Sequence, residues 1–126
     1  MEHNMVGWFE IPVRDMDRAK KFYETVFEVT LQIEQLGELV MGWFPWAEGK
    51  QGSSGTLALH KDFYTPSDSA GVLIYFTSLD VENEISRVEA AGGKVLQSKT
   101  LISEDIGYMA VFVDTEGNRI ALHSRA

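Results

Sequence analysis

The sequence predicts an α+β fold made of two copies of one βαβββ unit, whose curved mixed sheets enclose a shared cavity. Each half of the chain shows a strand, a helix and further strands in the same order. The segment LALH at 57–60 returns as IALH at 120–123, about half of the 126-residue chain later. One such unit cannot bury both faces of its sheet. Two paired units can, and a curved double sheet leaves a cavity.

The first unit is predicted over residues 5–62. Residues 6–13 alternate apolar side chains with others, at the period of two that is typical of a strand. Asp15 or Asp17 can cap a helix, and apolar residues at helical spacing continue it to Phe27. Further strands are predicted over 29–33, 39–44 and 56–60, with a polar, glycine-rich loop over 45–55.

The second unit is predicted over residues 70–125. Its helix is capped by Asp80 and stopped by Gly92 and Gly93. The segment DTEGN at 114–118 is predicted to be a hairpin turn. Strands are predicted over 72–77, 95–98, 108–113 and 119–123. A chain of this length fits one domain, so we expect the two units to form a single domain over residues 1–126.

Composition excludes several classes of function. The chain has no cysteine, which excludes disulfides, thiolate catalysis and cysteine-based zinc sites. Eleven basic residues against 19 acidic ones give a net charge of −8, which opposes nucleic-acid binding. The sequence shows no signal peptide, and no apolar run approaches the ~20 residues of a membrane span. We therefore expect a cytoplasmic protein without a nucleic-acid or membrane partner.

Three segments carry a resemblance to a known family. They are FEIPVRDMDRAKKFYETVF at 9–27, RVEAAGGKV at 87–95 and FVDTEGNRIALH at 112–123. With them the chain resembles the vicinal oxygen chelate superfamily, which includes glyoxalase I, bleomycin-resistance proteins and extradiol dioxygenases. The resemblance implies the glyoxalase/bleomycin resistance fold and frequent homodimers, sometimes with modules exchanged between chains. In metal-dependent members it also implies a divalent metal, held by His, Glu or Gln from the first and last strands of each module.

The four metal-ligand positions of the family fall on residues that cannot bind a metal. By the resemblance they are Trp8, Ala58, Leu73 and Ala121. None of these side chains can coordinate a divalent ion. The sequence therefore predicts no metal and no cofactor at this location, and it disfavours glyoxalase I chemistry and iron-dependent ring cleavage.

Polar side chains stand two positions further along the same strands, where they face the same side. They are Glu10, His60, Tyr75 and His123. One hypothesis is that they orient a ligand, with Glu10 or a histidine acting as a general base. The alternative is that both histidines lie at strand ends in solvent and that Glu10 meets a surface Lys or Arg. A shifted metal site built from Glu10, His60 and His123 is a third possibility.

The predicted function is the binding of a small organic molecule in an aromatic-lined cavity. The residues predicted to line it are Trp8, Trp43, Ala58, His60, Leu73, Tyr75, Tyr108, Ala121 and His123. A divergent lyase or isomerase that uses Glu10 or a histidine as its base is the alternative function. The two hypotheses differ in whether the ionisable side chains converge on one place in the cavity.

Overall fold

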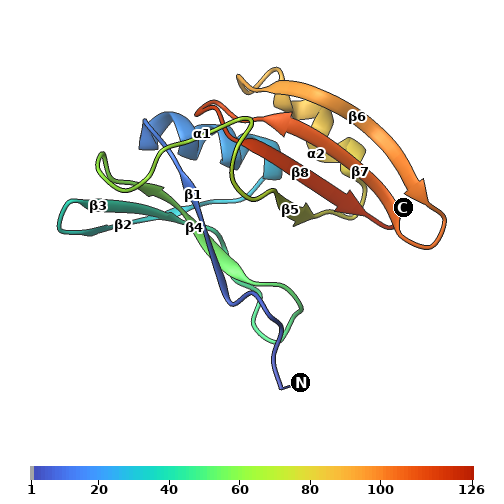
Figure 1. The fold of residues 1–126 in the computed structure, drawn as a ribbon, viewed down its shortest axis with the longest axis horizontal. Helices are drawn as coiled ribbons and strands as arrows, with labels where there is room; N and C mark the ends of the chain where they lie inside the picture. Colours follow the sequence, from blue (N-terminus) through green and yellow to red (C-terminus); the bar gives the residue numbers. More distant parts are fainter. Residues whose placement is uncertain (1) are drawn as a thin grey trace.

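A computed structural model describes residues 2–126, and each half of the chain forms its own sheet and helix (Figure 1). The first half contains β1 (Trp8–Pro12), α1 (Met16–Phe27), β2 (Gln32–Leu36), β3 (Leu39–Trp43) and β4 (Ser54–Leu59). The second half contains β5 (Ile74–Thr77), α2 (Val81–Val88), β6 (Lys94–Ser103), β7 (Gly107–Val113) and β8 (Arg119–Ser124).

The two sheets have equivalent topologies. Sheet 1 has the strand order β1-β4-β3-β2, and sheet 2 has the order β5-β8-β7-β6. In each sheet the first strand is parallel to the last, and the other pairs are antiparallel. The predicted α+β fold with two mixed sheets is therefore confirmed. β1 and β5 are edge strands of their sheets. Residues of both strands border the space between the two halves.

The two helices lie next to each other and supply one continuous core. Asp15 rather than Asp17 caps α1, because its carboxylate accepts the Arg18 N–H. Asp80 caps α2 as predicted, but α2 ends at Val88, and the remaining residues before the glycines form turns. Among residues 2–126, no helix is long and apolar enough to cross a membrane.

Two strand boundaries differ from the predicted ones for local reasons. The strand expected over 29–33 begins only at Gln32, since Glu28 ends α1 in the left-handed conformation and the Leu31 N–H donates to the Glu24 carboxylate. The strand expected over 95–98 extends over Lys94–Ser103. Its ladder to β7 contains register shifts, which disturb the alternation that sequence patterns depend on.

Sheet 1 has one covered face and one open face. Ile11 and Leu57 point towards α1 and belong to the core. Side chains alternate along a strand, so their neighbours point to the other side. We call that side the open face; it carries the side chains of Trp8, Glu10, Trp43, Thr56 and Ala58.

Candidate functional site

Two tryptophans form an exposed aromatic pair on the open face of sheet 1. The ring centroids of Trp8 and Trp43 are 4.8 Å apart, with the planes at 65° in an edge-to-face arrangement. Their residues are 38% and 37% exposed, respectively. Trp8 extends from β1 and Trp43 from β3, and β4 runs between these strands. The pair therefore offers aromatic surface to a ligand instead of filling the core.

Glu10 lies beside this pair and is held by two neighbours. Its carboxylate accepts a hydrogen bond from the Tyr64 hydroxyl and a longer one, 3.4 Å, from the Trp8 Nε1–H. Tyr64 comes from the segment that links the two halves of the chain. The hydrogen bond to Glu10, with partial burial, raises the pKa of Tyr64. The hypothesis that Glu10 meets a surface Lys or Arg is not what the structure shows: its partners are aromatic.

A buried hydroxyl without a hydrogen-bond partner, that of Thr56, lies on the same face. We call Trp8, Glu10, Trp43 and Thr56 the open-face cluster. Thr56 stands opposite Glu10 on one side and Trp43 on the other, so its side chain shares their face. It is fully buried. Within residues 2–126 its Oγ1 is the buried side-chain atom that lacks a hydrogen-bond partner. Burying a hydroxyl without a hydrogen-bond partner costs free energy, and most buried polar groups in folded proteins have one.

The predicted ionisable residues do not meet in one place. His60 follows β4, lies 3.6 Å from the Glu38 carboxylate and packs on Phe63. His123 is on β8, where its Nε2–H donates to the Ile106 carbonyl at 2.6 Å. Glu10 is on the other sheet, with its own partners. Within this chain the three side chains therefore do not form a shared acid–base site.

The structure places His60 with carboxylates that the sequence hypothesis did not include. Ligand atoms of Glu38, His60 and Asp62 lie within 4.8 Å of one another. The backbone N–H of Asp62 already donates to His60 Nδ1. Glu38 and Asp62 are exposed. This is a different set from the predicted shifted metal site of Glu10, His60 and His123.

A cavity lies between the two halves and on the α1 side of β1. It has a volume of about 880 Å³. Of the predicted ligand-binding residues, Leu73 and Tyr75 line it, whereas Trp8, Trp43, Ala58 and His60 do not. Its aromatic lining consists of Phe9, Phe27, Phe44, Trp46, Tyr75 and Phe76. Of the four aromatic residues predicted to line a cavity, Trp8, Trp43, Tyr75 and Tyr108, only Tyr75 lines this one.

The remaining predicted residues lie in sheet 2. Ala121 is fully buried beside Tyr75, which is half exposed. Tyr108 packs against the core, and the Lys99 ammonium lies 4.5 Å from its ring centroid. His123 stands opposite Met109, and neither Tyr108 nor His123 lines the cavity. Ala121, Tyr108 and His123 therefore belong to the other sheet and do not line the cavity.

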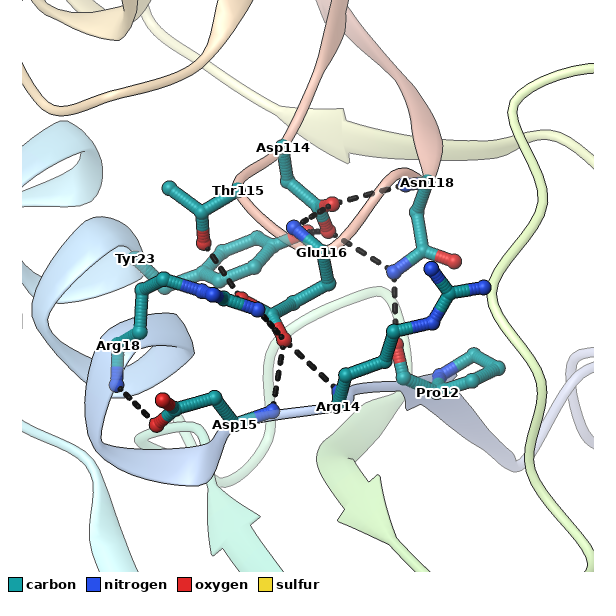
Figure 2. Close-up of polar contacts among 9 residues, drawn as sticks. All are labelled: Pro12, Arg14, Asp15, Arg18, Tyr23, Asp114, Thr115, Glu116 and Asn118. Carbon is teal, nitrogen blue, oxygen red and sulfur yellow. Dashed lines mark hydrogen bonds and ion pairs between the residues drawn. The ribbon is translucent and has the colours of Figure 1, made fainter. Parts of the chain in front are cut away.

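A third polar cluster joins the two halves and was not predicted from the sequence. We call it the hairpin clasp: Asp114, Glu116 and Asn118 of the turn between β7 and β8, bound to the start of the first half. Figure 2 shows Glu116 accepting hydrogen bonds from the Arg14 and Asp15 N–H groups and from the Arg18 guanidinium. Burial raises the pKa of Glu116, but these donors outweigh it and lower the pKa to about 2.

The other members of the clasp are also held by hydrogen bonds. Asp114 accepts from the Tyr23 hydroxyl at 2.7 Å and from the N–H groups of Glu116 and Asn118. The Asn118 amide donates to the Pro12 carbonyl. Because these carboxylates are buried and their oxygens occupied, the clasp fixes the hairpin on α1 and leaves neither carboxylate free for chemistry (Figure 2).

Comparison with known proteins agrees with this fold. A family model described as the glyoxalase/bleomycin resistance protein/dioxygenase superfamily matches residues 5–122. A glyoxylase-like domain-containing protein of Didymella fabae is 26% identical over 98% of this chain and 95% of that protein.

Solved structures resemble the whole chain at low sequence identity. TnmS3, an antibiotic binding protein from Streptomyces sp. CB03234, matches with a TM-score of 0.72 and 24% identity, covering 100% of this chain and 99% of its own. Glyoxalase I from Zea mays matches with a TM-score of 0.69 and 19% identity over 94% of this chain. This chain spans only 45% of the length of the maize protein.

Proposed function

The chain belongs to the glyoxalase/bleomycin resistance protein/dioxygenase superfamily, and from this premise we propose that it binds a small organic molecule on the open face of sheet 1. One observation carries the proposal: the exposed pair of Trp8 and Trp43 lies beside the Glu10 carboxylate. Indole faces attract cations, and a neighbouring carboxylate adds to that attraction. The preferred ligand is therefore a flat aromatic molecule with a positive charge.

The residues at the family's metal positions do not suit a metal. Ala58 and Ala121 are fully buried and bear only methyl groups, and Trp8 packs against Trp43. Leu73 lines an apolar cavity. Divalent metals in proteins take nitrogen, oxygen or thiolate ligands, which none of these side chains offers. We propose that binding here requires no metal, and no step of a reaction is derived through one.

The enzyme alternative has less support than binding. A general base needs the reacting group within hydrogen-bond reach and a partner to receive or return the proton. Glu10 is instead engaged by Tyr64, and His60 and His123 are engaged elsewhere. TnmS3, an antibiotic binding protein, has the same fold, which is consistent with a binding role.

A second copy of the chain is the proposed protein partner. Strand β6 is the edge of sheet 2, is ten residues long and exposes Leu96, Leu101 and Ile102. Long apolar edge strands favour association with another chain. Sedimentation of the wild type and of Leu101→Lys tests this: a dimer that the substitution dissociates is expected, and a wild-type monomer at all concentrations would refute it.

Fluorescence titration with two matched probes tests the binding proposal. N-methylquinolinium and quinoline have the same ring system and differ in charge. We expect the cation to quench tryptophan emission with about tenfold higher affinity than the neutral probe. Trp46→Phe serves as the background, so that the emission comes from Trp8 and Trp43 alone.

Matched variants show which residues cause the preference for the cationic probe. Glu10→Gln should remove most of the preference for the cation, and Trp8→Ala should weaken the binding of both probes. Glu34→Gln removes the same charge from the same face, at the β2 edge, and should change neither affinity. Equal affinity for the two probes, or equal effects of the two glutamine variants, would contradict the proposal.

A further inference from the structure

We propose that the cavity between β1 and β5 is a second binding site, which takes an uncharged apolar molecule of aromatic character. It is distinct from the open-face site, because the side chains that β1 contributes to the two sites point in opposite directions. Phe9 points into the cavity, whereas its neighbours Trp8 and Glu10 point to the open face. Neither Trp8 nor Glu10 lines the cavity.

Both halves of the chain contribute to the wall of the cavity. Phe9 of β1, Phe27 at the end of α1 and Phe44 after β3 come from the first half, and Phe76 of β5 comes from the second. The ring centroids of Phe27 and Phe76 are 4.7 Å apart, and those of Phe9 and Phe76 are 5.7 Å apart. The rings support each other in a fixed wall, and the volume of about 880 Å³ falls within the range of small-molecule sites.

The lining contains no charged side chain. Asp, Glu, Lys and Arg make up 24% of the sequence, yet among residues 2–126 none of these types and no histidine borders the cavity. A charged ligand would lose its hydration there without gaining a counter-charge, which is costly. Uncharged polar groups are present at the border, among them those of Gln51, Ser53 and Thr77. The ligand is therefore neutral, with at most a hydroxyl, carbonyl or amide group to bond with them.

Trp46 gives the cavity a spectroscopic reporter. It lies in the loop between β3 and β4, lines the cavity and is otherwise largely exposed. A large exposed aromatic side chain in a polar loop has no packing role of its own, and a ligand would bury part of its surface. Its emission is therefore expected to change when the cavity is filled.

Two dyes that differ in one sulfonate group test the proposal. N-phenyl-1-naphthylamine is neutral, and 8-anilinonaphthalene-1-sulfonate is the same ring system with a negative charge. At high salt, where the net charge of the protein is screened, we expect the neutral dye to bind at least about tenfold more tightly. Equal or tighter binding of the sulfonate would overturn the proposal.

Three substitutions test where the neutral dye binds. Thr77→Glu places a carboxylate at the cavity and should weaken the neutral dye by about fivefold or more. Thr100→Glu makes the same change at an exposed position of β6 outside the cavity and should have no effect. Trp8→Ala should also leave the dye affinity unchanged, although it should weaken the binding of both quinoline probes at the open face. Loss of dye binding in Trp8→Ala, or its persistence in Thr77→Glu when circular dichroism shows both variants folded, would overturn the second site.

Discussion

Glu116 attaches the second half of the chain to the first through several hydrogen bonds and an ion pair. It is 2% exposed, and its carboxylate is bound by two backbone N–H groups, a guanidinium and the Thr115 hydroxyl. Its pKa of about 2 lies below the ordinary value of 4.5. A carboxylate with a lowered pKa in the folded state stabilises the protein above its unfolded pKa.

We predict that Glu116→Gln lowers the free energy of unfolding at neutral pH by about 2–4 kcal/mol, because it removes the charge that Arg18 and the helix N-terminus require. Urea denaturation at pH 7 measures it. Glu104→Gln, a matched change at an exposed position of the turn between β6 and β7, should cost less than about 0.5 kcal/mol.

The lowered pKa of Glu116 predicts how the stability of the protein depends on pH. From pH 7 to 5 the contribution of this carboxylate is complete; it is lost as the pH falls from about 4.5 towards 2, by up to about 3 kcal/mol. Denaturation series at pH 5 and pH 3 should show this loss in the wild type and a smaller one in Glu116→Gln. Identical losses in the two proteins would show that Glu116 is not the group responsible.

At the scale of the elements, the pairing of β1 with β4 depends on one glycine. A Cβ atom added at Gly55 would lie 2.3 Å from the Phe9 ring and 2.5 Å from the Phe9 carbonyl oxygen. The backbone oxygen cannot move aside without displacing β1. Since β1 carries Trp8 and Glu10 on one face and Phe9 on the other, both proposed sites depend on this close approach.

We predict that Gly55→Ala destabilises the protein by about 1–3 kcal/mol through overpacking. Gly7→Ala is the control, because an added Cβ there meets nothing within 4 Å; it should change stability by less than about 0.5 kcal/mol. Thermal unfolding of both variants is the measurement. Equal melting temperatures of the two variants would show that the close approach of β1 and β4 at Gly55 does not limit the stability of the protein.

Sequence patterns were sufficient for most elements and failed where tertiary contacts intervene. The cap at Asp80 follows from local chemistry, which the sequence carries, whereas for the first helix the sequence left Asp15 and Asp17 open. The start of β2 does not follow from local chemistry, because it depends on the Leu31 N–H reaching Glu24 seven residues earlier. The length of β6 was underestimated because register shifts against β7 hide its alternation.

At the scale of the molecule, the repeat of LALH and IALH predicted the two-unit fold, but not which side chains meet. The period of two placed Trp8 and Glu10 on one face. The sequence does not reveal that β4 brings Thr56 beside them, or that the linker brings Tyr64. Phe9 and Phe76 look like ordinary core residues in the sequence, and only the packing shows that they border a cavity.

If the molecule has two separate binding sites, one for an aromatic cation and one for an uncharged aromatic molecule, its three tryptophans report on both. An amide correlation spectrum resolves one indole N–H signal for each. N-methylquinolinium should move the signals of Trp8 and Trp43 and leave that of Trp46, whereas N-phenyl-1-naphthylamine should move only that of Trp46. If the cation moves the Trp46 signal alone, or moves none of the three, the molecule does not have these two separate sites.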